Sequence, residues 1–402
     1  MEWDKITLDK LGSVSRGRSK HRPRNDESLF NGIYPFIQTG DVKRSGLHIV
    51  DYTETYNEKG LAQSKLWAPG TLCITIAANI ADTSILSFPA CFPDSIIGFV
   101  ADKEKSDVRF IKYSFDILQK KCQAISLGAT QDNLSWEKLS KIKFDIPSLS
   151  IQHCIASILS AYDNLIENNN KRIRLLEQMA ENLYKEWFVR FRFPGHENAE
   201  FENGLPKGWK REKIGKVYNT CSGGTPSRVN EDFYNNGSIP WVKTGELQDC
   251  LIHDAEEFIT EDALKRSSAK LLPNHSLLMA MYGVNIGKLG ILRKEMTCNQ
   301  AVCAFLPKTA DQTFYYLYFY LKGIRNYLLS ISFGAAQQNL SQALIKNVRI
   351  MIPHNDTLQK FENKVSCYFD QISIYQRQNE QLARQRDLLL PRLMSGKLEV
   401  NV

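Results

Sequence analysis

Positive charge is concentrated in one short segment near the start of the chain. Arg16, Arg18, Lys20, Arg22 and Arg24 alternate with other residues, and no acidic residue intervenes. Cations spaced in this way along an extended segment can contact successive phosphates of a nucleic acid. The pattern equally fits a solvated loop, because the net charge of +7, from 51 Lys and Arg against 44 Asp and Glu, is only a mild basic bias. The segment is therefore a candidate DNA contact.

The second half of the chain carries different candidates. Arg228 ends a glycine-rich turn that starts at Cys221, and Lys243 and Asn285 could read base edges in a groove of duplex DNA. Amide side chains that could do the same occur at Gln131, Asn133, Gln337 and Asn339. These four lie in Gln-x-Asn-Leu-Ser sequences that both halves share, so they are poor candidates for telling two sequences apart. We expect each Asn-Leu-Ser to start or cap a helix.

Signatures of catalysis are missing from the chain. It has no G-x-G-x-x-G, residues 283–289 fail the phosphate-loop pattern, and no H-E-x-x-H or Cys/His cluster has metal-ligand spacing. Pro93-Asp94 resembles the start of a nuclease motif only superficially, and the Asn-Pro-Pro-aromatic motif of adenine methyltransferases is absent. The nine cysteines form no C-x-x-C pair and are expected to be reduced. We predict no catalytic residue, no metal site and no bound cofactor.

The chain repeats itself after about half its length. Trp3 recurs as Trp209, and Tyr34-Pro-Phe-Ile-Gln-Thr-Gly-Asp-Val42 recurs as Ile239-Pro-Trp-Val-Lys-Thr-Gly-Glu-Leu247. Likewise, Gly128-Ala-Thr-Gln-Asp-Asn-Leu-Ser135 answers Gly334-Ala-Ala-Gln-Gln-Asn-Leu-Ser341. Because the offset stays almost constant along the chain, the sequence indicates one module duplicated in tandem.

Each copy divides into a globular head and a helix. Residues 1–147 and 209–353 carry short β-rich runs broken by Gly, Pro and Asn, which predict two mixed α/β heads. Residues 148–192 and 354–395 show heptads, which predict two long coiled-coil helices. Residues 193–208 have the composition of a linker, and residues 396–402 are a short tail. The predicted fold is thus α+β, with two tandem heads, two long helices and approximate two-fold symmetry.

The heptads define one stripe on each helix. The first contains Ile155, Ile158, Tyr162, Leu165, Asn169, Leu176, Met179 and Leu183, and the second contains Leu358, Phe361, Val365, Tyr368, Ile372, Tyr375, Asn379, Leu382, Leu389 and Leu393. The asparagines fix the register if they are buried, and are otherwise solvated. At 1.5 Å per residue each helix is about 60 Å long. Helices of this length are expected to pair with each other.

Two similar heads held apart by paired helices suit a target with two sites at fixed spacing. Duplex DNA is such a target, because half-sites one helical turn apart lie about 34 Å apart. The heads differ at the basic segment, so they would read different half-sites. The alternative is a protein scaffold without sequence-specific DNA contact, which leaves the duplicated heads and the basic segment unexplained.

Taken together, these motifs resemble the specificity subunits of type I restriction-modification systems. The resemblance covers essentially the whole chain. It rests on the tandem heads, the Leu205-Pro-Lys-Gly-Trp209 entry, the paired Thr-Gly-acid and Gln-x-Asn-Leu-Ser blocks, and the helix ends Glu186–Phe191 and Leu388–Leu398. The first head departs from the pattern, because no Leu-Pro-x-Gly precedes Trp3 and basic residues replace the Gly-Gly-Thr-Pro turn.

The resemblance implies a non-catalytic subunit whose heads are target recognition domains for the two parts of a split double-stranded DNA site. Its antiparallel helices would set the spacer between these parts. It also implies a complex with two methyltransferase subunits, which bind S-adenosylmethionine, and with restriction subunits that use ATP and Mg²⁺. No apolar stretch approaches the roughly 20 residues of a membrane span, and the start is not a signal peptide. A cytoplasmic location is therefore expected.

Overall fold

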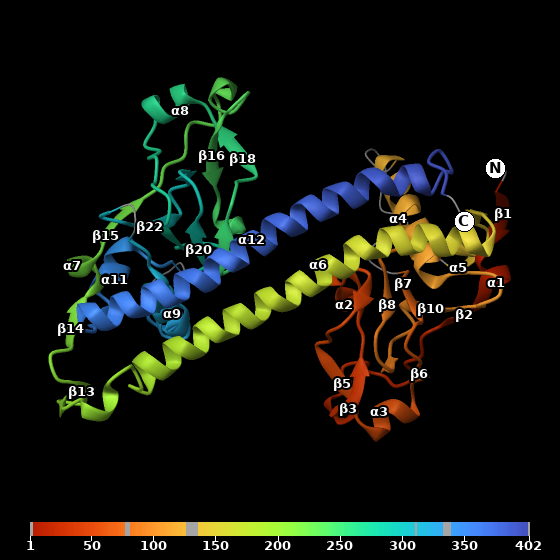
Figure 1. The fold of residues 1–402 in the computed structure, drawn as a ribbon, viewed down its shortest axis with the longest axis horizontal. Helices are drawn as coiled ribbons and strands as arrows, with labels where there is room; N and C mark the ends of the chain where they lie inside the picture. Colours follow the sequence, from red (N-terminus) through yellow and green to blue (C-terminus); the bar gives the residue numbers. More distant parts are fainter. Residues whose placement is uncertain (1–2, 77–80, 126–135, 310–311, 333–338, 401–402) are drawn as a thin grey trace. The chain divides into compact units, whose positions relative to one another are not determined.

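The computed structural model of the protein describes residues 3–76, 81–125, 136–309, 312–332 and 339–400. It forms two compact units, one of residues 1–171 with 375–402 and the other of residues 172–374. The long helices α6 (Leu149–Tyr184) and α12 (Asn355–Leu393) each contribute one part to each unit (Figure 1). Each unit therefore consists of one head and a segment of both helices.

The first head is built on a five-stranded sheet in the order β2-β10-β7-β8-β4. These strands are β2 (Gly12–Arg16), β10 (Ile96–Ala101), β7 (Leu72–Thr75), β8 (Thr83–Leu86) and β4 (His48–Ile49). A second sheet has the order β5-β3-β9-β6, with β5 (Glu54–Tyr56), β3 (Phe30–Phe36), β9 (Ala90–Cys91) and β6 (Leu66–Trp67). A separate ribbon pairs β1 (Asp4–Thr7) with β11 (Lys143–Ile146). The helices of this head are α1 (Leu8–Leu11), α2 (Thr39–Arg44), α3 (Glu58–Ala62), α4 (Val108–Ile125) and α5 (Trp136–Leu139).

The second head repeats the five-stranded sheet and the two-stranded ribbon, and its second sheet has three strands where that of the first head has four. Its five-stranded sheet has the order β15 (Asn219–Ser222), β22 (Val302–Leu306), β19 (Leu277–Ala280), β20 (Leu289–Leu292) and β17 (Cys250–Ile252). In both sheets only the last pair, β4 with β8 and β17 with β20, is parallel. The remaining strands are β18 (Glu257–Ile259), β16 (Ile239–Val242) and β21 (Thr297–Cys298) in a second sheet, and the ribbon of β14 (Lys210–Lys213) with β23 (Arg349–Ile352). The duplication read from the sequence is thus a duplication of fold.

Helices complete the second head at corresponding places. They are α7 (Ile214–Val217), α8 (Glu261–Arg266), α9 (Tyr315–Gly323), α10 (Arg325–Ser332) and α11 (Gln342–Asn347). The Ser341 side chain caps α11 by accepting from the Leu344 amide at 3.1 Å, which confirms the cap expected at this Asn-Leu-Ser. The corresponding Asn133-Leu-Ser, with Gln131, and also Gln337 lie outside the described residues.

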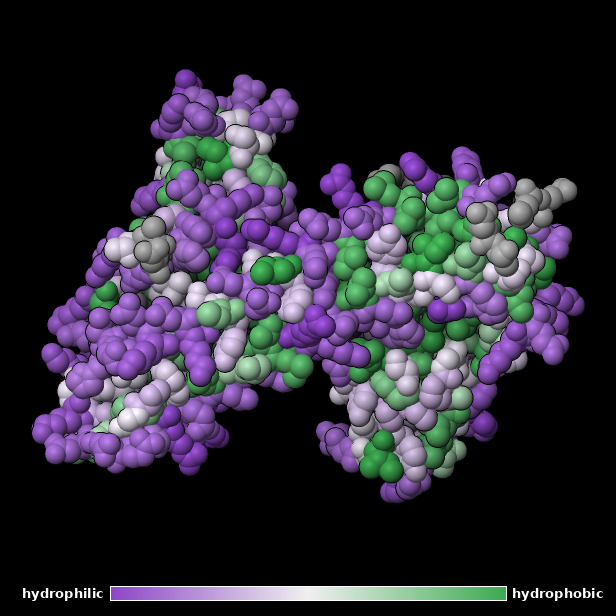
Figure 2. Space-filling view, in the orientation of Figure 1, coloured by the Kyte–Doolittle hydropathy of each residue, from purple (hydrophilic) through white to green (hydrophobic). Residues whose placement is uncertain are grey.

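Apolar strands and helix faces form a core in each unit. In the first, strands β7 and β10 join Phe110 of α4 and Leu390 of α12, and in the second α9 is almost entirely buried. Burying one such side chain stabilises a fold by about 1.5–3 kcal/mol. The face of the protein that Figure 2 shows is mostly hydrophilic and carries several hydrophobic patches.

The segment predicted to be a linker has structure of its own. Residues 193–208 contain a 3₁₀ turn (His196–Asn198) and a hairpin of β12 (Phe201–Glu202) with β13 (Leu205–Pro206). Phe193 is buried and its ring lies 5.0 Å from that of Trp209. The packing of Phe193 on Trp209 anchors the segment to the second head.

In the first unit α6 and α12 pair side by side in opposite directions. Asp163 of α6 forms an ion pair with Arg386, and six residues further on the Asn169 amide donates to the Asn379 side-chain oxygen at 2.9 Å. The Asn379 amide in turn donates to Asn170 at 2.8 Å. Asn169 is 5% exposed. The two asparagines are therefore partners in the seam and not two solvated residues.

The prediction of the first stripe is wrong at two residues. Leu165 and Met179 are about half exposed, at 51% and 49%. The buried positions nearby are Asp163, Asn169 and Ala180. An apolar-only heptad count misses polar residues that face inward because a partner satisfies them. The second stripe is buried or half-buried at every position.

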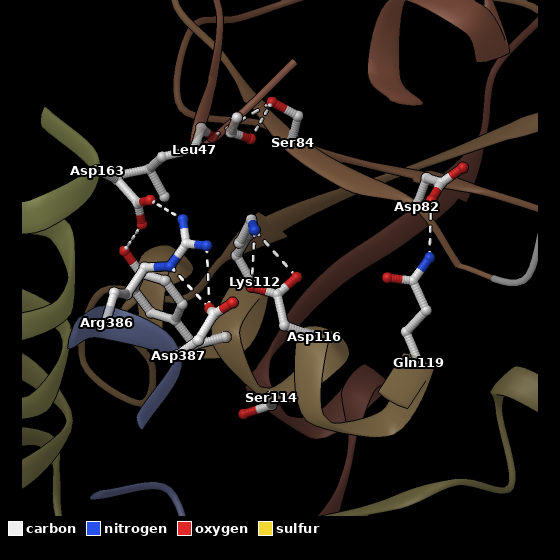
Figure 3. Close-up of polar contacts among 12 residues, drawn as sticks. Leu47, Asp82, Ser84, Lys112, Ser114, Asp116, Gln119, Asp163, Arg386 and Asp387 are labelled. Atoms are coloured by element: carbon white, nitrogen blue, oxygen red, sulfur yellow. Dashed lines mark hydrogen bonds and ion pairs between the residues drawn. The ribbon is translucent and has the colours of Figure 1, made fainter. Parts of the chain in front are cut away.

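A polar network holds α4 of the first head against both long helices (Figure 3). The Tyr113 hydroxyl donates to Asp163 at 2.5 Å, and Arg386 pairs with Asp163 and with Asp387. Burial, followed by the Asp163 carboxylate, raises the pKa of Tyr113 far above its usual range, so the phenol stays a donor. In the second unit Glu362 of α12 plays a similar part, because it accepts from the Tyr315 and Tyr316 amides at the start of α9.

Candidate nucleic-acid interface

The basic arm, residues 16–24, continues strand β2 of the first head. Its backbone is tied to two neighbouring segments, with Gly17 N–H donating to Ile96 O at 2.8 Å and Lys20 N–H donating to Gln63 Oε1 at 2.6 Å. A Cβ at Gly17 would meet the Pro93 carbonyl oxygen at 2.2 Å, so only glycine lets the arm lie this close. The arm is therefore fixed to the head and presents its cations from a defined track.

The five cations of the arm divide into two groups. Arg22 and Arg24 form ion pairs with Asp94, at 3.7 and 2.7 Å. Arg16, Arg18 and Lys20 are exposed, and within the described parts of the chain they have no ion-pair partner. We call these three the free cations. They can exchange water for phosphate without breaking an internal ion pair.

A sixth cation joins this group from another segment. The Lys65 ammonium lies 3.4 Å from the Ser15 hydroxyl and 3.5 Å from the centre of the Trp67 ring. Residue 65 is far from the arm in sequence, so no local pattern could have identified it. Ser64 fixes this placement, because its hydroxyl donates to the Arg18 carbonyl at 2.8 Å.

A cleft of about 590 Å³ opens beside the basic arm. Polar groups that can read base edges line it, including Arg24, Asn25, Asn31, Gln38 and Glu54. The Gln38 amide donates to Glu54 at 2.6 Å and so fixes the orientation of both side chains. A cleft that combines Arg24 of the basic arm with fixed amide and carboxylate groups is suited to contact both the backbone and the base edges of DNA.

The predicted candidates of the second head are engaged within the protein. Arg228 pairs with Glu257 at 2.6 Å and stacks on Tyr234, 4.2 Å from the ring centre. Lys243 pairs with the same carboxylate at 2.9 Å. The hydrogen bond to Glu257 raises the pKa of Lys243, and the Lys243 hydrogen bond lowers the pKa of Glu257. The first head thus offers free cations where the second holds a neutralised cluster.

Asn285 also has a structural partner. Its amide donates to the carbonyls of Thr244 and Gly245, at 3.0 Å each, and so joins the β19–β20 loop to the Thr-Gly-acid turn. The tip of this loop projects Val284, which is fully exposed, beside Tyr282. An exposed apolar tip next to polar groups is suited to contact a thymine methyl group or a base step. This tip was not among the sequence candidates, because an exposed valine carries no pattern.

No helix of the described residues is long and apolar enough to cross a membrane. Within those same residues, no group of three or more His, Cys, Asp or Glu side chains could hold a metal ion.

Comparison with known proteins decides the family. The profile of the type I restriction modification DNA specificity domain matches residues 1–178 and again 206–384. The chain belongs to this family. The two matches coincide with the two copies of the repeat, and each spans one head and most of the long helix that follows it.

Relatives of similar length are themselves specificity subunits. The chain is 27% identical to the type I restriction enzyme MjaIX specificity subunit of Methanocaldococcus jannaschii, over 99% of this chain and 94% of that protein. It is 22% identical to the HindI specificity subunit of Haemophilus influenzae, over 99% and 100% of the two chains. The crystal structure of an S subunit from M. genitalium matches its fold with a TM-score of 0.62 and 17% identity, covering 98% of this chain and 96% of that one.

Proposed function

We propose that this specificity protein recognises a bipartite double-stranded DNA site, one part with each head, and that its helices set the spacer. The observation that supports this proposal is that the two heads share the topology of their five-stranded sheet but differ in chemistry at the same place. At the end of β2 the first head has free cations, and at the end of β15 the second has Arg228 neutralised by Glu257. Equal scaffolds with unequal surfaces suit two different half-sites.

We further propose that catalysis belongs to partner subunits. Two methyltransferase subunits would bind S-adenosylmethionine and methylate an adenine in each half-site, and restriction subunits would use ATP and Mg²⁺. This chain would bind DNA and hold the partners, and it would carry no catalytic residue or cofactor. Membership of a DNA specificity family supports this division and gives the scaffold alternative no support.

Heptad deletion tests the role of the helices. Removing seven facing residues from both α6 and α12 keeps the stripes aligned and shortens the pair by about 10 Å, at 1.5 Å per residue. Since duplex DNA rises about 3.4 Å per base pair, we expect the preferred spacer to shorten by about three base pairs. The half-site sequences should not change. Altered half-sites with an unaltered spacer would contradict the proposal, and a deletion from α6 alone is the control for disrupted pairing.

A further inference from the structure

One turn has the same unusual chemistry in both heads. It consists of Thr39-Gly40-Asp41 at the start of α2 and of Thr244-Gly245-Glu246, a 3₁₀ turn, in the second head. The acidic residue of each turn faces inward. Asp41 Oδ2 accepts from the Gln38 backbone N–H at 2.7 Å, and Glu246 Oε1 accepts from the Lys243 backbone N–H at 2.8 Å. The acid therefore builds the turn, and its charge is not presented to a ligand.

No described neighbour requires the residue at this place of either turn to be glycine. A Cβ at Gly40 or at Gly245 would meet no atom within 4 Å, and neither residue has a positive φ. Among the glycines that the structure describes, only Gly323 shares both properties. In a helical turn alanine is more stable than glycine. Two open glycines at equivalent places of a duplicated fold indicate that something outside the chain approaches these backbones closely.

The threonines add a second unused group. Thr39 and Thr244 are partly exposed, and in the part of the chain that the structure describes neither hydroxyl has a hydrogen-bond partner. In the second head the carbonyls of Thr244 and Gly245 both accept from Asn285. The Thr244 hydroxyl is therefore available as a hydrogen-bond donor to a ligand, whereas the two carbonyl oxygens of the turn already accept hydrogen bonds. A hydroxyl donor beside a residue without a side chain suits a phosphate oxygen.

The surroundings favour DNA over a protein ligand. Gln38 and Thr39 line the same cleft as Arg24 of the basic arm. In the second head Lys243 directly precedes the turn and shares Glu257 with Arg228. Each turn therefore lies beside the segment that follows β2 or β15. In the first head this segment carries the free cations, and in the second it carries Arg228, which Glu257 neutralises. Because the turns are alike and these segments differ, the turns fit the part of the target that both half-sites have in common.

Resting on the proposed function, we propose that Thr39–Gly40 and Thr244–Gly245 each pack against the sugar-phosphate backbone of bound DNA. They form a pair of equivalent, sequence-independent contacts. The Thr hydroxyl donates to a phosphate oxygen, and the missing Cβ lets the strand reach the protein backbone. Discrimination between half-sites is left to the cleft and to the arm.

Substitution of the open glycines tests this proposal in the full-length protein. Gly40→Ala and Gly245→Ala should leave thermal stability unchanged or slightly higher, since neither site has a steric neighbour. Each should weaken binding to a labelled duplex about tenfold, equally for target and random sequences, as expected for a backbone contact. The matched control is Gly323→Ala, which changes an equally open glycine at the end of α9 and should not affect DNA binding.

A second set of variants removes only the hydroxyl. Thr39→Val and Thr244→Val keep the shape of the side chain, and each should weaken binding to both duplexes several-fold. Unchanged affinity of all four variants would overturn the inference. So would retained DNA affinity with loss of methyltransferase co-purification, which would make the turns a protein contact. If the unaltered protein itself fails to bind DNA, the proposed function fails, and the two failures are thus distinguishable.

Discussion

The network of Tyr113, Asp163 and Arg386 fixes how firmly the first head is held on its helices. Replacing Asp163 with alanine removes the acceptor of a buried hydroxyl, which costs about 1–3 kcal/mol. It also removes a partner of Arg386, whose side chain is 25% exposed and still pairs with Asp387 at 3.0 Å. Loss of Asp163 therefore costs Arg386 much less free energy than the loss of the partner of a fully buried charge. We expect a total loss of about 3 kcal/mol.

The Tyr113→Phe variant separates the two contributions. Alone it should cost about 1 kcal/mol, because one hydrogen bond is lost. Combined with Asp163→Ala it should cost almost nothing more, since without Asp163 the hydroxyl has no acceptor in this network. The double variant is therefore expected at about 3 kcal/mol, against about 4 for independent sites.

Hydrogen exchange of the α4 amides, followed by mass spectrometry, measures the loss of local stability around α4. A local measurement is needed because the two units of the protein need not unfold together. Exchange should accelerate in the Asp163 variant and no further in the double variant. Gln119→Ala is the matched control in the same helix, because it removes the hydrogen bond from the Gln119 side chain to Asp82 (Figure 3) and should cost about 1 kcal/mol. Additive effects, or unchanged α4 exchange, would refute the reasoning.

Three further predictions concern charge and register. Changing the three free cations to glutamine should reduce the slope of log affinity against log salt by up to about 3, at about 0.9 per phosphate; if changing the two Asp94-paired arginines has the same effect, the division of the arm is wrong. Replacing Asn169 and Asn379 together by leucine should leave the melting temperature equal or higher, whereas Asn169→Leu alone should lower it, because it strands the Asn379 oxygen; calorimetry of both variants decides this. Burial opposes ionisation of Asp249, but hydrogen bonds from Arg325, Lys288 and the Leu289 amide outweigh it and hold its pKa below 3.8, so its stabilisation is present above that pH and is lost as pH falls through the lower folded pKa. Urea unfolding of the second unit from pH 6 to pH 2 should therefore lose its steepest acid dependence in Asp249→Asn, and an unaltered profile would contradict this.

What the sequence predicted correctly has local or periodic causes. The repeat identified two heads of one topology, and the heptads identified both long helices. Errors arose where a partner distant in sequence decides burial. Asp163 faces inward because Tyr113 and Arg386 satisfy it, so the apolar count placed Leu165 in the seam instead.

The candidate interface was predictable only in part. Five alternating cations marked the arm, but Asp94, which neutralises two of them, is about 70 residues away. Lys65 and the cleft arise only once β3, β5 and the arm come together in the fold. Whether the candidate residues contact DNA stays a prediction, because no sequence pattern relates single residues of such a head to bases.

The most direct test of the central claim is single-molecule sequencing of adenine methylation in cells. Cells that express the proposed partner methyltransferase with this chain are compared with cells that express the methyltransferase alone. Bipartite recognition predicts a split methylated motif that is present with this chain and vanishes without it. Identical methylation profiles with both subunits expressed would contradict the account.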